Sequence, residues 1–159
     1  MTNSMKHLRC ESHGVVRLVT FDRPEKKNAL SNEMRSQLCG LLADLDADET
    51  VKAVVLTGTD PAFTAGVDFT DIDPAFKASE AQYSVNPGRA LRAMSTPVLC
   101  AVNGACVSGG LEIALSATFI VASTQARFAD THARLGVVPT WGLTALLPRA
   151  IGVRRAREL

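Results

Sequence analysis

The chain has 159 residues, 47% of them hydrophobic and 21% charged, with a formal net charge of +1, which is typical of one soluble domain. Scattered basic residues and an aromatic content of 5% argue against a nucleic-acid partner, and no apolar run approaches membrane-spanning length. Residues 1–11 lack the apolar core of a signal peptide, and the four cysteines lack metal-site spacing, so we expect reduced thiols in the cytoplasm.

The first half of the chain predicts two strands separated by a helix. Residues 14–21 are β-branched and partly alternating, which predicts a strand, and residues 22–28 end it with polar turn residues. After Ser31, a suitable N-cap, apolar side chains recur at helical spacing: Met34, Leu38, Leu41, Leu42 and Leu45. Residues 51–57 are mostly apolar, which predicts a strand buried on both faces.

The second half continues the alternation of strands and helices. Residues 70–88 are polar and irregular, and we expect a mobile, partly helical insertion there. A short helix is predicted over 89–94, a strand from Val98, short strands over 119–122 and 126–128, and a helix from Trp141-Gly142 that Pro148 kinks or ends. This alternation favours the α/β class with a largely parallel sheet.

A glycine-rich turn follows the strand that begins at Val98. The chain passes through Asn103-Gly104 and then Gly109-Gly110 before a helix whose first turn holds Glu112. Such a turn presents unpaired backbone N–H groups at the helix start, and glycine lets another group approach them. Spacing alone leaves two interpretations open. One is a reactive site beside Glu112, and the other is a tight connection in which Glu112 only offsets the helix dipole.

Residues 103–112 resemble the signature of the enoyl-CoA hydratase/isomerase (crotonase) superfamily, in which an Asn-Gly turn leads to a glycine cluster and a helix-opening Glu. Three further segments are similar to motifs of that family, in the same order and spacing. They are Arg23-Pro24 with Asn28-Ala29-Leu30, then Phe63-Thr64-Ala65-Gly66-Val67-Asp68-Phe69, and residues 128–136 with Pro139 and Trp141-Gly142. Each motif alone is a weak signal, whereas four in register indicate the family.

The resemblance implies an α/β fold built as a crotonase-like superhelix of strand-strand-helix units. Residues 1–159 would form a single core domain that is C-terminally truncated, because it lacks the family's C-terminal helices. No separate cofactor and no metal are implied, since coenzyme A is part of the acyl-CoA substrate. A homotrimer or a dimer of trimers is implied if the full-length chain exists.

The resemblance also implies how the substrate lies. The backbone N–H groups of Val67 and Gly109 would form an oxyanion hole for the thioester carbonyl, where each preorganised donor is worth roughly 3–4 kcal/mol. The loop after Arg23 and the region of Ala65 would hold the nucleotide end of coenzyme A. The implied substrate-binding residues are Lys26, Ala29, Ala65, Asp68 and Phe69. Lys26 is a candidate phosphate contact, with a solvated turn lysine as the alternative.

By the same resemblance, Glu112 and His132 are the catalytic residues. Glu112 aligns with one of the two catalytic glutamates of the hydratases and would activate water. His132 stands where the best-known hydratases carry the second glutamate, and it would donate a proton to the substrate α-carbon, since histidine titrates near neutral pH. The alternative is that His132 is a bystander and Glu112 works alone. Asp130 is expected to cap the turn that holds His132.

The resemblance therefore implies an enoyl-CoA hydratase-like lyase that adds water to a trans-2-enoyl-CoA. One alternative is another CoA-thioester enzyme of the superfamily, a double-bond isomerase or a hydrolase. The other is an inactive truncated fragment, because residues 152–159 look like the opening of a helix that stops without a cap.

Overall fold

The computed structural model describes residues 5–71 and 85–159, within which the strands form two sheets. The larger sheet has the order β1-β2-β3-β5-β7, with bounds Leu8–His13, Val16–Phe21, Ala53–Gly58, Val98–Val102 and Phe119–Ala122. The smaller sheet has the order β4-β6-β8, with bounds Ala62–Thr64, Ala105–Val107 and Arg127–Ala129. Apart from the antiparallel pair β1 and β2, neighbouring strands are parallel, as the α/β prediction required.

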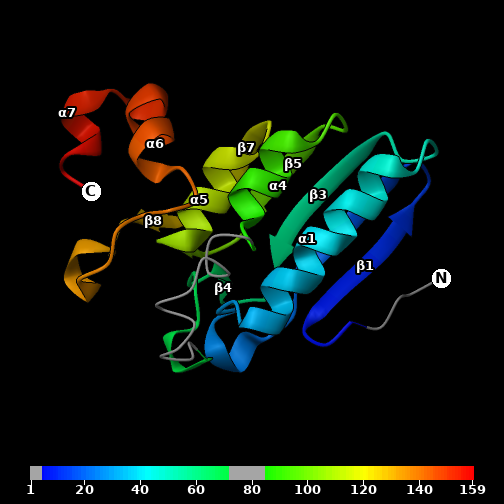
Figure 1. The fold of residues 1–159 in the computed structure, drawn as a ribbon, viewed down its shortest axis with the longest axis horizontal. Coiled ribbons are helices and arrows are strands. Elements are labelled where there is room, and N and C mark those ends of the chain that lie inside the picture. The colour runs from blue at the N-terminus through cyan, green and yellow to red at the C-terminus, as the bar shows by residue number, and fades with distance from the viewer. Residues whose placement is uncertain (1–4, 72–84) are drawn as a thin grey trace.

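Helices connect these strands and cover one side of the sheets (Figure 1). The α-helices are α1 (Asn32–Ala47), α4 (Pro87–Ala93), α5 (Gly109–Ser116), α6 (Leu143–Ile151) and α7 (Val153–Ala156). Short 3-10 helices are η1 (Pro24–Lys26), η2 (Phe69–Asp71) and η3 (Ala133–Leu135). Most of the predicted insertion, residues 72–84, lies outside the described residues.

The same unit recurs along the chain, with one strand in each sheet followed by a helix. In order along the chain, β5, β6 and α5 form one such unit, and β7, β8 and α6 form the next. This recurrence is the superhelix of strand-strand-helix units that the resemblance implied. Its effect is to place the β6–α5 turn between the ends of β4 and β8, the two strands that flank β6.

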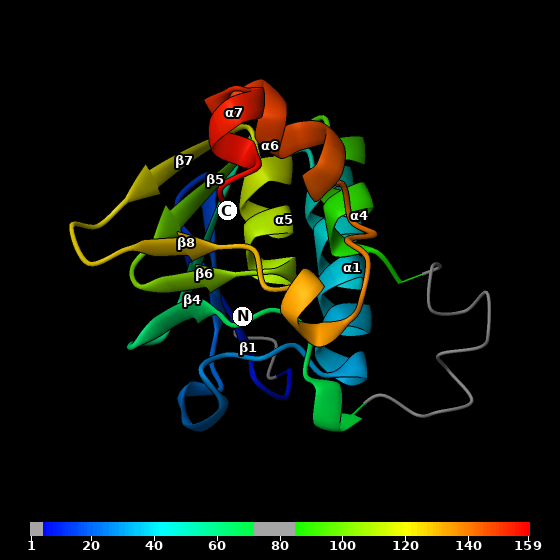
Figure 2. The same ribbon diagram turned by 90° about the vertical axis from the view of Figure 1, so that its left-hand side faces the viewer.

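Helix α5 lies at the centre of the molecule, with the strands on one side and α1 and α4 on the other (Figure 2). Most of its residues are buried, Glu112 among them. Helix α1 adds an apolar stripe in which Met34, Leu38 and Leu42 are fully buried. Ser31 is its N-cap, as predicted, because the Ser31 Oγ accepts a hydrogen bond from the Met34 N–H (3.1 Å).

The strand predicted over 14–21 is confirmed as β2, but it is the second arm of a hairpin that turns at Gly14, where φ is +61°. Strand β1 escaped prediction because it is an edge strand with charged, exposed side chains, so its apolar alternation is weak. Pro148 was predicted to kink or end the helix. It does not end α6, which continues to Ile151, because burial of Leu143 and Leu147 holds the helix despite the hydrogen bond that proline cannot make.

Candidate active site

Val67, the first predicted amide donor, lies in a short bridge with Leu30. The Leu30 N–H donates to the carbonyl oxygen of Gly66 (2.7 Å). The Asp68 N–H donates to the Leu30 carbonyl oxygen (3.0 Å). Because successive residues of an extended segment direct their amides to opposite sides, the N–H of Val67 points away from Leu30.

The turn that contains Val67 packs against the turn that contains Gly109. At this contact neither Gly66 nor Gly109 has room for a side chain. A β-carbon at Gly66, where φ is +87°, would lie 2.9 Å from the Gly109 nitrogen and 2.9 Å from the Val107 carbonyl oxygen. A β-carbon at Gly109 would lie 2.9 Å from Cζ3 of the Trp141 ring. Two turns that are distant in the sequence therefore come together at the Gly109 amide, where glycine permits both approaches.

The Gly109 amide opens a helix. Gly109 is the first residue of α5, so its N–H has no acceptor within that helix. Ser108 precedes it with φ 50° and ψ −115°, and within the described chain the Ser108 side chain makes no capping bond to α5. A helix N-terminus of this kind favours a negatively charged or partly negative group.

Glu112 lies one turn further along α5 and is 2% exposed. Its Oε1 accepts hydrogen bonds from the backbone N–H groups of Trp141 (2.7 Å) and Leu143 (3.1 Å), so it caps the beginning of α6. Burial raises the pKa of Glu112, against the hydrogen bonds from Leu143 and Trp141 and the charge of His132, which lower it. Oε1 thus binds the start of α6, and Oε2 takes no part in these two hydrogen bonds.

His132 faces that second oxygen. The His132 Nε2 lies 3.6 Å from Glu112 Oε2, and the histidine is 8% exposed. On the other side of the ring, Asp130 Oδ1 lies 2.5 Å from His132 Nδ1 and also accepts from the His132 backbone N–H (3.0 Å). Asp130 was predicted as the N-cap of this turn, but His132 is the N-cap of η3, and Asp130 instead holds the histidine backbone and ring so that Nε2 lies toward Glu112. The two predicted catalytic side chains are neighbours.

The predicted coenzyme A residues lie on two adjoining loops. The Ala65 N–H donates to the carbonyl oxygen of Lys27 (3.0 Å), which joins the loop after Arg23 to the region of Ala65. Lys26 is exposed at the end of η1, and Ala29 is half-buried. Phe69 is 43% exposed at the start of η2. These positions leave the side chains of Lys26 and Phe69 accessible to a ligand.

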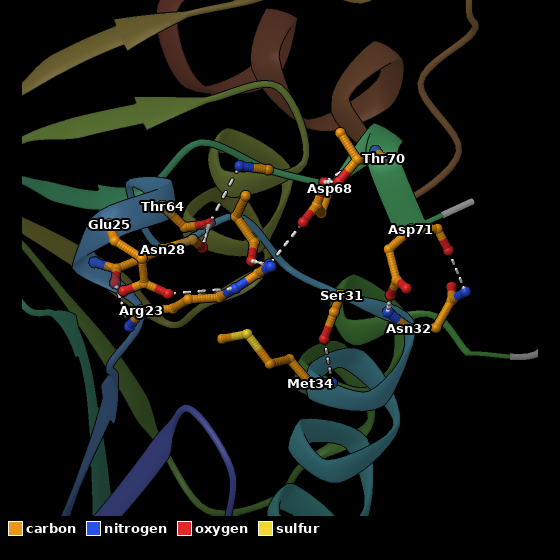
Figure 3. Close-up of polar contacts among 12 residues, drawn as sticks. Arg23, Glu25, Asn28, Ser31, Asn32, Met34, Thr64, Asp68, Thr70 and Asp71 are labelled. Atoms are coloured by element: carbon orange, nitrogen blue, oxygen red, sulfur yellow. Dashed lines mark hydrogen bonds and ion pairs between the residues drawn. The ribbon is translucent and has the colours of Figure 1, made fainter.

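Asp68 differs from its prediction as a substrate contact. It is 6% exposed, and its Oδ2 accepts from Arg23 Nη1 (2.7 Å) while its Oδ1 accepts from the Thr70 hydroxyl (2.6 Å) (Figure 3). Burial raises the pKa of Asp68, but the hydrogen bonds from Thr70 and Arg23 outweigh it, and the pKa lies below its usual range. Both oxygens are occupied within the protein, so this carboxylate braces the loop.

Comparison with known proteins identifies the family. The family model described as enoyl-CoA hydratase/isomerase matches residues 11–159. The chain belongs to this family. Crystal structures of enoyl-CoA hydratases from Mycobacterium tuberculosis H37Rv and Bacillus anthracis are similar to it. The first has a TM-score of 0.82 and 41% identity over 96% of this chain and 64% of that one. The second has a TM-score of 0.89 and 27% identity over 97% of this chain and 62% of that one.

Two relatives in the enoyl-CoA hydratase/isomerase family carry different activities in their names. The short-chain-enoyl-CoA hydratase of Clostridium acetobutylicum is 33% identical over 153 residues, covering 94% of this chain and 59% of the relative. The 1,2-epoxyphenylacetyl-CoA isomerase of Escherichia coli K12 is 37% identical over 151 residues, covering 91% and 58%. The chain thus spans about three fifths of the length of these relatives.

Sequence reasoning missed several residues that support this family's site. Asn28, fully buried with φ 56°, holds the loop after Arg23. Its Nδ2 donates to the carbonyl oxygens of Thr59 (2.8 Å) and Ala62 (2.7 Å). Trp141 covers Gly109 and donates its backbone N–H to Glu112. Both residues lie within the family motifs, but neither the motif nor the type of residue predicts these contacts.

A hollow at the last two helices involves none of the predicted site residues. This hollow, of about 680 Å³ beside α6 and α7, is lined by Ile151, Arg155, Glu158 and Leu159. Among residues 5–71 and 85–159, no three His, Cys, Asp or Glu side chains gather as metal ligands would. In that same portion, no helix is long and apolar enough to cross a membrane.

Proposed function

We propose that this chain is the core of an enoyl-CoA hydratase-like lyase that adds water to a trans-2-enoyl-CoA. The observation that carries the proposal is the meeting of three groups at one place. These are the open amide of Gly109 at the start of α5, the turn of Val67 against it, and the Glu112–His132 pair one helical turn away. Membership of the enoyl-CoA hydratase/isomerase family supports the substrate class.

The amides of Val67 and Gly109 would bind the thioester oxygen. Addition of water to the conjugated double bond places negative charge on that oxygen in an enolate-like transition state. Fixed donors in a buried site stabilise this charge without reorganising during the reaction. Because charge develops only as the bond forms, these amides lower the barrier more than they tighten binding of the substrate.

Glu112 Oε2 and His132 would move the protons. The reaction starts with an ionised Glu112 and a protonated His132. Glu112 Oε2 takes a proton from water as the water oxygen bonds to the β-carbon, and His132 Nε2 gives a proton to the α-carbon. The pair is then a protonated carboxyl and a neutral imidazole. Transfer across the 3.6 Å between Oε2 and Nε2, directly or through one water, restores the starting state.

Glu112→Gln tests this proposal. The glutamine carbonyl oxygen still accepts from Trp141 and Leu143, so the fold and binding of an acyl-CoA are retained. The base is lost, and we expect hydration of a short trans-2-enoyl-CoA, followed by loss of the conjugated absorbance, to fall by roughly 10²–10⁴-fold. Full activity of this variant contradicts the role of Glu112. For His132→Gln, an unchanged rate and pH profile makes His132 a bystander.

A double-bond isomerase is the second candidate, because the Escherichia coli relative is named an isomerase. The same active site protonates and deprotonates carbon beside a thioester, and the assay separates the two. Conversion of a 3-enoyl-CoA to its 2-enoyl isomer, without net uptake of water, favours the isomerase. Hydration of the 2-enoyl-CoA with no action on the 3-enoyl-CoA favours the hydratase.

The alternative to an enzyme is an inactive fragment, because the chain spans about three fifths of the length of these relatives. Size-exclusion chromatography with a coenzyme A titration distinguishes it. A trimer that binds coenzyme A supports the enzyme, and aggregation without binding supports the fragment. These measurements test trimeric assembly and binding of coenzyme A, and a cytoplasmic location stays a prediction.

A further inference from the structure

A closed ring of hydrogen bonds links Arg92 of α4 to Glu112. The Arg92 Nη1 donates to the Ser116 Oγ (2.6 Å) and to the Trp141 carbonyl oxygen (2.7 Å). The Ser116 hydroxyl donates to the main-chain carbonyl oxygen of Glu112 (2.7 Å). The Trp141 N–H donates to the Glu112 Oε1 (2.7 Å), which closes the ring. The Arg92 Nη1 thus contacts Ser116, which bonds to the main chain of Glu112, and Trp141, which bonds to its carboxylate.

The packing around this ring is tight. A β-carbon at Gly88 of α4 would lie 2.6 Å from the Trp141 carbonyl oxygen and 3.0 Å from the Ser116 Oγ. A β-carbon at Gly142, where φ is +123°, would lie 3.0 Å from the Arg92 Nη1. Helix α4, helix α5 and the start of α6 therefore meet at one joint, and the Trp141 carbonyl is held against α4.

The peptide between Trp141 and Gly142 carries the influence of Arg92 toward the carboxylate. Its carbonyl accepts from Arg92, and the amides on either side of it, those of Trp141 and Leu143, donate to Glu112 Oε1. The bond from Arg92 fixes this peptide in place, and with it the two neighbouring amides that donate to Glu112. Arg92 is exposed, so solvent screens its charge and the effect depends on its hydrogen bonds.

Few other charged groups surround Glu112 in the described part of the chain. His132, at the N-cap of η3, faces its Oε2 at 3.6 Å. Arg35 of α1 lies over the Trp141 ring, 5.9 Å from the ring centroid. Arg92 differs from both because it reaches the main-chain groups that hold Oε1.

We propose that Arg92 is a positioning residue that keeps the Glu112 carboxylate in place by clamping Trp141 and Ser116. This inference rests on the proposed function only in taking Glu112 as the base. Loss of the clamp frees the beginning of α6, weakens the donors to Oε1 and lets the carboxylate turn away from His132.

The experiment compares Arg92→Met with Arg89→Met, a matched change of an exposed arginine on the same helix. The titration of the Glu112 carboxyl carbon is followed by NMR, which requires no catalysis. We expect Arg92→Met to move the Glu112 midpoint upward, because its donors are weakened, and Arg89→Met to leave it in place. Hydration is expected to lose about tenfold in kcat with KM within about twofold, since a displaced group slows the reaction without removing substrate contacts.

Two further variants separate the possible outcomes. Arg92→Lys restores one cationic donor and is expected to recover part of both effects, and Ser116→Ala cuts the ring while leaving the contact between Arg92 and Trp141. If Arg92→Met does not fold, Ser116→Ala is expected to show a smaller upward shift. An unchanged Glu112 midpoint in whichever of the two variants folds overturns the proposal. An inactive wild-type chain that still shows the shift contradicts the hydratase function and supports the positioning role.

Discussion

Ser108 combines an unfavourable backbone conformation with two hydrogen bonds, and two substitutions separate these contributions. Its φ of 50° and ψ of −115° form a pair that residues with a β-carbon rarely adopt. Its Oγ accepts from the Thr131 N–H (3.2 Å) and lies 2.5 Å from the Thr131 Oγ1. The strain is located directly before Gly109, the predicted amide donor.

The magnitudes follow from these contacts. Ser108→Ala removes both hydrogen bonds, keeps the strain and leaves polar groups of Thr131 without their partner, which costs about 1–3 kcal/mol in unfolding free energy. Ser108→Gly loses the same bonds but releases strain of about 1–3 kcal/mol. After allowing about 0.5–1 kcal/mol for the greater freedom of glycine when unfolded, we expect the glycine variant to be more stable than the alanine variant by about 1 kcal/mol.

Urea unfolding monitored by circular dichroism measures this difference, provided that the m-values agree. The matched control is Ser36, an exposed residue within α1, where alanine is expected to be more stable than glycine by about 1 kcal/mol. The reversed order at Ser108 is the signature of strain. A Ser108→Ala variant as stable as Ser108→Gly, with the ordinary order at Ser36, refutes it.

Three other predictions concern protonation. Asp68→Asn is expected to destabilise the chain by about 2 kcal/mol at pH 7. Although burial raises the pKa of Asp68, its hydrogen bonds lower it further, so this loss shrinks as pH falls below about 4 in urea titrations. Burial raises the pKa of Glu112, so the free energy of unfolding relative to that of Glu112→Gln is expected to decline as pH rises above about 4, the usual pKa of a glutamate. Burial raises the pKa of Cys100 to about 12 and that of Cys106 also, so mass spectrometry is expected to find partly exposed Cys10 alkylated before either.

The sequence predicted the elements whose signal lies in one continuous stretch. The stripe of α1 and its Ser31 cap show in consecutive turns, and the short strand β7 falls at the predicted residues 119–122. Strands β4 and β6 have three residues each, too few for alternation to appear. These two strands pair with each other although they lie far apart in the chain, and a local sequence pattern carries no information about such pairing.

The supporting contacts of the site could not be predicted for a related reason. Arg92 looks like any solvated arginine, and its partners come from α5 and from the start of α6. Asp68 lies within a family motif, but the motif carries no record of whether its carboxylate faces a ligand or an internal arginine. Ser108 lies in a glycine-rich turn, and a serine at this position does not by itself predict a positive φ.

Spacing left two interpretations of Glu112 open, a reactive carboxylate or a charge that only offsets the dipole of its own helix, and the structure gives the side chain a contact that neither included. Its carboxylate does cap a helix, but the helix is α6 and not its own, and the capping uses Oε1. Oε2 lies toward His132 instead. In the proposed reaction Oε2 acts as the base, so a glutamine at this position would keep the bonds that hold α6 but would not take the proton from water. The proposed role of Arg92 follows from the same division, because the Trp141 amide that fixes Oε1 also sets the direction of Oε2.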